Sequence, residues 1–240
     1  MVDTPGSPFQ AHLSELRQRM REACERSGRQ PQDVALVVVT KTVTIQAIRL
    51  LPSLGVTDVG ESRVQDALPK IEAAGGGLRW HFLGHLQSNK ARKVAARFDA
   101  IHSIDSVDIG RRVAHAAREA GRSIDAFVQV NVAGEPQKSG LEPEAARAVA
   151  GELVALDGLR LVGLMTMAPL SEDPEEARPV FRKLRELFEE LRESEDLGPS
   201  FCHLSMGMTD DFEVAIEEGA TLIRVGRAVF QGLPDRRLLG

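Results

Sequence analysis

The feature that most constrains the fold of this chain is a regular alternation of short apolar runs with longer amphipathic ones. The runs with strand composition cover residues 34–41, 57–62, 79–84, 100–105, 126–132, 159–167, 201–207 and 221–226. Helical patterns lie between them at 44–54, 64–74, 89–98, 106–121, 142–156, 174–194 and 211–219. Such alternation is typical of a parallel sheet with right-handed crossovers. Eight units in roughly 200 residues predict a closed (β/α)₈ TIM barrel, an α/β fold.

An open doubly wound sheet is the alternative topology. No strand run is followed by a G-x-G-x-x-G turn, which argues against a dinucleotide-binding sheet of that kind. We therefore predict one barrel domain over residues 10–240. Residues 1–9 are expected to form a flexible N-terminal tail. An extra N-terminal helix follows over 10–28, with Leu13, Leu16, Met20 and Cys24 on one stripe and Gly28 at its end.

Composition excludes several classes of function. The chain has 240 residues, a net charge of −5 and acidic and basic residues intermixed, so we expect no nucleic-acid partner. Its two cysteines, Cys24 and Cys202, fit no metal spacing and no disulfide framework. We find no signal peptide and no apolar run long enough to span a bilayer. The prediction is a cytoplasmic protein that has no membrane association and no metal site.

Lys41 ends a run of β-branched residues whose two faces are both apolar. Period-two alternation places Val37, Val39 and Lys41 on one face of the strand. A charged lysine is costly in such surroundings unless it reaches water or loses its charge. Desolvation favours the neutral amine, which can form a Schiff base.

The runs at 201–207 and 221–226 end in sequences typical of an anion site. Ser205, Gly207 and Met208 precede one helical pattern, and Gly226 and Arg227 begin the next. Backbone N–H groups at glycine-bearing helix starts bind anions, and barrels often bind phosphate in the loops after strands seven and eight. We therefore predict a phosphate ligand at these loops.

Arg224 alternates with Gly226 and is expected to face the same ligand-binding rim. Its guanidinium needs an acceptor. Two alternatives are open: a salt bridge to an acidic side chain (Asp210, Asp211 or Glu61), or contact with a ring nitrogen or other ligand acceptor. A lysine, a phosphate site and an arginine on one rim together favour pyridoxal 5′-phosphate (PLP), which supplies an aldehyde, a phosphate and a pyridine nitrogen.

Several longer stretches resemble one family. They are VVVTKT, GESRVQD, WHFLGHLQSNK, IHSIDS, VQVNVAGEPQKSGL, GLMTMAP and LSMGMTDDFEVAIEEGATLIRVGRAVF. In this order they are similar to the pyridoxal phosphate homeostasis proteins, whose fold is related to the N-terminal barrel of alanine racemase. The resemblance implies PLP on Lys41, phosphate contacts at Ser205 and near Gly226 and Arg227, and a ring-nitrogen contact at Arg224. The family often has Asn where this chain has Ser62, which puts any asparagine-mediated role there in doubt.

Other residues near the strand ends have two interpretations each. Met165, with Met167, Met206 and Met208, is expected either to pack around a flat ring or to belong to ordinary core. Ser88 is predicted to cap the following helix, in preference to a catalytic role for His81 or His85. Lys138 is a candidate to receive PLP or a phosphate.

Two classes of function compete. The first is a PLP-binding protein, involved in intracellular vitamin B6 and amino-acid homeostasis and not itself an enzyme. The second is a PLP-dependent amino-acid racemase or lyase, which needs a strong electron sink and a second acid–base group besides the lysine. An arginine on the pyridine nitrogen weakens that sink, so we favour the first. Apo forms of PLP-dependent enzymes are its candidate recipients, and a monomer or weak homodimer is its expected state.

Overall fold

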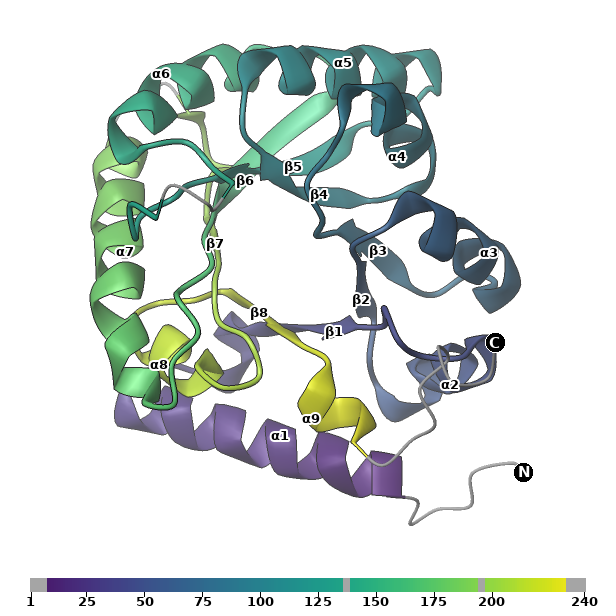
Figure 1. Ribbon diagram of the computed structural model, residues 1–240, viewed down its shortest axis with the longest axis vertical. Coiled ribbons are helices and arrows are strands. Elements are labelled where there is room, and N and C mark those ends of the chain that lie inside the picture. Colours follow the sequence, from purple (N-terminus) through teal and green to yellow (C-terminus); the bar gives the residue numbers. More distant parts are fainter. Residues whose placement is uncertain (1–7, 136–138, 194–196, 232–240) are drawn as a thin grey trace.

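The eight predicted strands form one closed, parallel barrel in chain order, which confirms the predicted fold class (Figure 1). The computed structural model describes residues 8–135, 139–193 and 197–231. Lys138 and residues 1–7 of the predicted tail lie outside this part. The strands are β1 (Ala35–Val39), β2 (Asp58–Glu61), β3 (Arg79–Phe82), β4 (Ala100–Ile104), β5 (Ile124–Gln129), β6 (Leu159–Met165), β7 (His203–Ser205) and β8 (Leu222–Val225). β1 pairs with both β2 and β8, and this pairing closes the barrel.

Most strands are shorter than their apolar runs predict. β1 ends at Val39, two residues before Lys41, and residues 41–42 form a turn. β7 ends at Ser205, and Gly207 adopts a φ of +93° that lies outside the extended region. The carboxyl ends of the strands therefore carry longer loops than expected.

The helices surround the barrel as an outer ring (Figure 1). They are α1 (Pro8–Arg26), α2 (Ile45–Leu50), α3 (Val64–Ala74), α4 (Ala91–Arg97), α5 (Val107–Glu119), α6 (Pro143–Val154), α7 (Arg178–Glu193), α8 (Phe212–Glu217) and α9 (Arg227–Phe230). Short 3₁₀ turns occur at Pro31–Asp33, Pro52–Leu54, Ser88–Lys90 and Pro174–Ala177. The predicted cap at Ser88 is wrong, because this residue starts a 3₁₀ turn and α4 begins at Ala91 without a side-chain cap bond.

The N-terminal helix begins earlier than predicted. Phe9, expected in the tail, lies in α1, is buried and stacks on Phe230 with ring centroids 5.4 Å apart. A buried aromatic pair contributes stability beyond the area that it buries, which accounts for the ordered start. α1 packs along α8 and α9 and completes the outer ring beside β1 and β8 (Figure 1).

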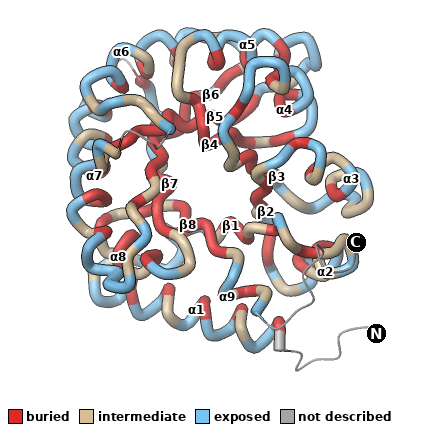
Figure 2. The backbone as a smooth tube through the Cα atoms, in the orientation of Figure 1, coloured by how far each residue is buried: buried red, intermediate tan, exposed pale blue. Residues whose placement is uncertain are grey.

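Two apolar layers stabilise the barrel. A large cluster fills the space between strands and helices, while a small one inside the barrel contains Val37, Phe127, Val162, Met165 and Leu222. Most strand residues are buried, and exposed residues occur mainly on the outer helices (Figure 2). Since Val37 is in the inner cluster and Val38 in the outer one, the predicted alternation along β1 is confirmed.

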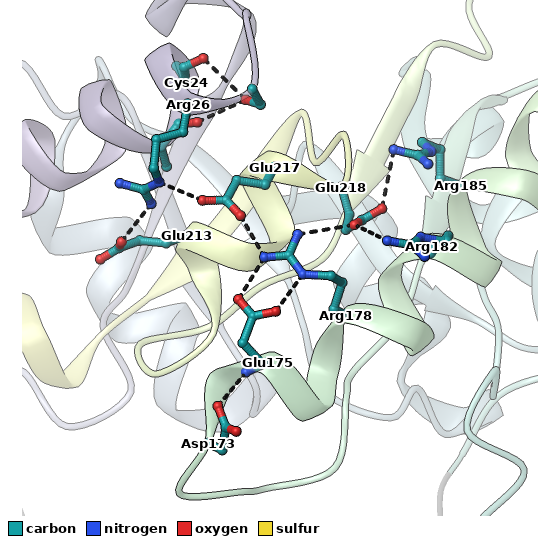
Figure 3. A network of polar contacts seen from close by, with 12 residues as sticks. Cys24, Arg26, Asp173, Glu175, Arg178, Arg182, Arg185, Glu213, Glu217 and Glu218 are labelled. Carbon is teal, nitrogen blue, oxygen red and sulfur yellow. Dashed lines mark hydrogen bonds and ion pairs between the residues drawn. The ribbon is translucent and has the colours of Figure 1, made fainter.

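An ionic network joins helices that are far apart in the sequence (Figure 3). Arg178 contacts Glu175, Glu217 and Glu218, while Arg26 of α1 pairs with Glu217. Glu218 is buried and also receives Arg182 and Arg185. The network thus ties α1, α7 and α8 together on the outside of the barrel.

Candidate functional site

The carboxyl ends of all eight strands meet at one end of the barrel, here called the mouth. Lys41 lies just beyond β1 at this end and its side chain is exposed. The expectation of a lysine desolvated among valines is therefore wrong for this structure, because the turn after Val39 carries the side chain out of the strand. Within the described residues Lys41 makes no hydrogen bond or ion pair, so its amine is free to bind a ligand.

A second lysine, which the sequence analysis missed, lies buried behind the end of β1. Lys70 of α3 is completely buried, with its Nζ 2.6 Å from Glu61 Oε1 and 2.6 Å from the Thr40 carbonyl oxygen. Thr40 Oγ1 also donates to Glu61 Oε1 at 2.7 Å. The Lys70 amine is thus engaged by two acceptors and links α3 to the ends of β1 and β2, whereas the amine of Lys41 is available. Nothing in the helical periodicity of 64–74 marks this pairing.

Arg224 lies inside the barrel, where its Nη1 donates to Ser205 Oγ at 2.6 Å and its Nη2 to the Thr166 carbonyl oxygen at 2.9 Å. Within the described residues it forms no salt bridge. Asp210 pairs instead with Arg227, and Glu61 pairs with Lys70. The salt-bridge alternative is therefore wrong. Burial lowers the pKa of Arg224 to about 10, against the opposing effect of the Asp211 charge. The guanidinium is still charged at neutral pH.

A chain of polar side chains crosses the barrel interior below Arg224. Ser205 Oγ lies 2.7 Å from His102 Nδ1, His102 Nε2 lies 2.8 Å from His81 Nδ1, and His81 Nε2 lies 2.8 Å from Asp58 Oδ1. Both histidines are completely buried. The runs at 79–84 and 100–105 were predicted as apolar strands, yet β3 and β4 each place a histidine in the barrel interior. Strand alternation could have predicted that these histidines point inward. It could not have predicted the hydrogen bond between them, which joins two strands.

The loops after β7 and β8 form the opposite side of the mouth. Gly207 requires glycine, because a Cβ there would lie 2.5 Å from Ala215 Cβ in addition to the positive φ. The Met208 N–H donates to Asp211 Oδ1 at 2.5 Å, so this predicted anion donor already has a partner. Burial raises the pKa of Asp211. Gly226 lies against Val39 of β1, where a Cβ would come 3.0 Å from the Val39 carbonyl oxygen.

A cavity of about 1030 Å³ opens between these loops and the turn after β1. Thr42, Val43, Thr209, Gly226 and Arg227 are among its lining residues. Lys41 directly precedes Thr42. A space of this size accepts a cofactor-sized molecule, and the residue with the free amine is the sequence neighbour of one of its lining residues. The residues present thus fit a phosphorylated aldehyde such as PLP.

The remaining predicted site residues lie at different depths. Met165 is buried in the inner apolar cluster, whereas Ser62 is half-buried just after β2. His85 reaches the exposed rim, where its Nδ1 lies 3.3 Å from Asp105 Oδ2. Ser205, Arg224 and Met165 therefore share the interior, while Lys41, Gly226 and Arg227 share the mouth.

Neither a membrane segment nor a metal centre is found in the described parts of the chain. Within 8–135, 139–193 and 197–231 no helix has the length and apolar character needed to cross a bilayer. The same residues contain no group of three or more His, Cys, Asp or Glu side chains placed to bind a metal ion.

The barrel, with its free lysine after the first strand, defines a protein of the alanine racemase barrel class. Residues 11–234 match the family model described as alanine racemase, N-terminal domain. More narrowly, the chain belongs to the pyridoxal phosphate homeostasis protein family. It is 41% identical over 219 residues to the family member from Aquifex aeolicus, a match that covers 91% of this chain and 95% of that one. The Escherichia coli member is 36% identical over 224 residues, with 91% and 94% covered.

Solved structures agree with this assignment. PipY of Synechococcus elongatus, solved with PLP bound, has a TM-score of 0.79 and 35% identity, and the match covers 92% of this chain and 99% of that chain. Alanine racemase from Clostridium difficile has a TM-score of 0.74 at 14% identity, covering 95% of this chain and 57% of that one. The second likeness shows a shared fold only.

Proposed function

We propose that this protein binds PLP through the Lys41 amine and takes part in vitamin B6 and amino-acid homeostasis inside the cell. The observation that carries the proposal is the free, exposed amine of Lys41 at the mouth, in the residue directly before Thr42, which lines the cavity. A relative at 35% identity, PipY, has been solved with PLP bound. The relatives from Aquifex aeolicus and Escherichia coli are named pyridoxal phosphate homeostasis proteins.

Different residues at the mouth are proposed to bind different parts of PLP. When bound, PLP supplies an aldehyde that a lysine amine captures covalently with loss of one water. Gly226 and Arg227 line the cavity where we place the phosphate, beside backbone N–H groups at the start of α9. Ser205 ends β7 in the interior below, Gly207 lies in the loop that follows it, and Ser62 lies after β2. Met165 provides apolar packing below.

Arg224 favours binding over catalysis in this proposal. It is a buried cation without a carboxylate partner in the described part of the chain, where only two of its five N–H groups donate to acceptors of the protein. A guanidinium that donates to a pyridine nitrogen keeps that nitrogen unprotonated, which weakens the electron sink that carbanion chemistry requires. Apo PLP-dependent enzymes are the proposed recipients of the stored cofactor.

The experiment is a titration of purified protein with PLP, followed by visible absorption. Wild type should develop the band of lysine-bound PLP, and Lys41→Ala should not, although its circular dichroism spectrum stays that of wild type. Lys93→Ala, which changes an exposed lysine on α4, is the matched control and should behave as wild type. A full band in Lys41→Ala would reject the proposal.

The phosphate assignment has its own measurement. Unphosphorylated pyridoxal offers the same aldehyde and ring nitrogen, so it should bind far more weakly than PLP if the loops after β7 and β8 hold the phosphate. Equal affinity of the two compounds in the same titration would remove the phosphate from these loops.

A further inference from the structure

An interior series of hydrogen bonds leads from Asp58 through His81 and His102 to Ser205 and Arg224, and its first three residues have no role in the function described so far. Each link is between 2.6 and 2.8 Å. The series begins at the first residue of β2, at the end of the barrel opposite the mouth, and finishes on β8 below the mouth. A continuous set of buried, mutually bonded groups of this kind is costly unless every member is satisfied.

The Asp58 carboxylate, at one end of the series, determines which atom donates in the first hydrogen bond. Asp58 accepts from Thr57 Oγ1 at 2.6 Å. Burial tends to raise the pKa of Asp58, but hydrogen bonds from His81 and Thr57 and the nearby charge of Arg79 outweigh it, so the pKa is lowered. Asp58 is therefore a carboxylate at neutral pH and can only accept. His81 must then donate from Nε2.

Of the two buried histidines, His102 is the one whose surroundings favour a neutral ring. Burial lowers the pKa of His102 well below its ordinary value, and the charges of Arg224 and Arg79 act in the same direction. If His81 carries a single ring proton, on the Nε2 that faces Asp58, its Nδ1 accepts, so His102 donates from Nε2 and accepts at its own Nδ1. The charged and titratable groups around the pair are Asp58, Arg79, Asp125, His203, Arg224 and Asp211.

Ser205 is the link whose orientation then becomes fixed. Its one proton points to His102 Nδ1, which leaves its oxygen to accept from Arg224 Nη1. We propose that Asp58, His81 and His102 are positioning residues that hold the Ser205 hydroxyl as an acceptor and, through it, hold the Arg224 guanidinium at the base of the PLP site. The consequence for the ligand rests on the proposed function; the proton arrangement does not.

The first test uses the protein without PLP. Nitrogen-15 NMR of the histidine rings, assigned with His81 and His102 variants, should show both rings neutral near pH 7 with the proton on Nε2. A charged His81 together with a proton on His102 Nδ1 would reverse the chain and overturn the proposal. Because no PLP is present, this result is independent of the proposed function.

The second test is a double-mutant cycle on PLP retention, measured by spectral titration. His102→Phe keeps a ring against Phe127, whose centroid lies 4.3 Å from that of His102, but removes both nitrogens. His102→Phe and Ser205→Ala should each weaken PLP binding about tenfold, the effect of losing one hydrogen bond to a charged group. Because both act through the same hydroxyl, the double variant should lose no more than Ser205→Ala alone.

Two further variants complete the cycle. His102→Asn keeps an acceptor near the Nδ1 position and should retain more PLP than His102→Phe. His115→Gln changes an exposed histidine of α5 and should match wild type. The positioning role would be overturned if the losses of PLP affinity from His102→Phe and Ser205→Ala added in the double variant. It would also be overturned if His102→Asn bound PLP no better than His102→Phe, because His102 would then act on packing alone.

Discussion

At the scale of single residues, the two basic side chains at the site lie in opposite surroundings. Lys41 is exposed at the mouth, while Arg224 is buried inside the barrel. Strand-end position predicted from the sequence that both belong to one rim. It could not predict how far the turn after Val39 turns Lys41 outward, because that depends on packing between the loops after β1 and β8.

The buried acceptors of Arg224 were also beyond sequence reasoning. Ser205 was identified as a phosphate contact from its position at a strand end, yet its hydroxyl bonds to Arg224 and His102. Its partners come from strands more than 100 residues away (His102) and from β8, and no local pattern records such contacts. Identification of the ligand class therefore relied on residue types, whereas the internal bonding required the fold.

The catalytic alternative makes a prediction at this scale, namely that racemisation of amino acids is negligible. A racemase needs a base on each face of the cofactor, and this chain contains no tyrosine. His203 is bonded to Thr221 away from the mouth, and His85 lies exposed on the rim beside Asp105. PLP-loaded protein incubated with L-alanine or L-serine in deuterated buffer should show turnover well below roughly 1 s⁻¹ by chiral chromatography.

His85→Asn is the accompanying variant, and it should leave this residual rate unchanged. A wild-type rate of about 1 s⁻¹ or more that disappears in His85→Asn would identify the exposed histidine as the second base. Such a result would replace the binding protein with an enzyme.

At the scale of elements, the existence and order of strands and helices were predictable, but their ends were not. Alternation and helical periodicity indicate which residues face the core. Residues that face the core continue beyond the last hydrogen bond between neighbouring strands, so the apolar runs are longer than the strands. β7, for example, has three residues although its apolar run has seven. The ends are set by turns such as the one at Gly207, whose φ is +93°.

Gly207 gives the first prediction for an element. Alanine there meets both a positive φ, which costs about 1–2 kcal/mol, and a contact of 2.5 Å with Ala215 Cβ of α8, which typically adds about 1–3 kcal/mol. Gly28→Ala is the matched control, because Gly28 has a φ of +68° in open space. Urea unfolding should show Gly207→Ala to be the more destabilising of the two; equal losses would mean that α8 moves freely away.

The Lys70–Glu61 pair gives the second prediction for an element. This pair links α3 to the ends of β1 and β2. Glu61→Gln leaves a completely buried cation without its counter-charge and should cost about 3–5 kcal/mol. Glu190→Gln removes a surface partner of Arg147 and should cost about 1 kcal/mol or less. Similar urea midpoints for both variants would show that Lys70 reaches water or another anion.

At the scale of the whole molecule, the closed barrel was predictable because eight alternating units leave few topologies. The way in which α1 packs on the barrel was less predictable. Its stripe predicted a buried face, but not that it would pack along α8 and α9 or join the ionic network through Arg26. Those contacts link the two ends of the described chain, and sequence periodicity carries no information about such distant partners.

Buried histidines predict how the stability of the whole molecule depends on pH. Burial lowers the pKa of His102 and of His203 below the ordinary value of 6.5, so the folded protein binds fewer protons than the unfolded chain below that pH. The free energy of unfolding should therefore fall as the pH drops below about 6.5, by up to about 1.4 kcal/mol per pH unit for each proton. The lowered pKa of Asp58 adds a loss only at more acid pH.

Urea unfolding between neutral pH and pH 5 measures this slope. His102→Phe removes one of the two groups and should flatten the dependence, whatever its effect on stability at neutral pH. His115→Gln, at an exposed position, should keep the wild-type slope. Identical slopes in wild type and His102→Phe would show that His102 does not stay neutral in the folded state.

The central claim is that the amine of Lys41 is the one that captures PLP, and peptide mapping tests it most directly. PLP-loaded wild type is reduced with borohydride, digested and analysed by mass spectrometry. The account predicts the pyridoxyl group on the peptide that contains Lys41. Its recovery on another lysine instead, such as Lys70 or Lys138, would contradict the account.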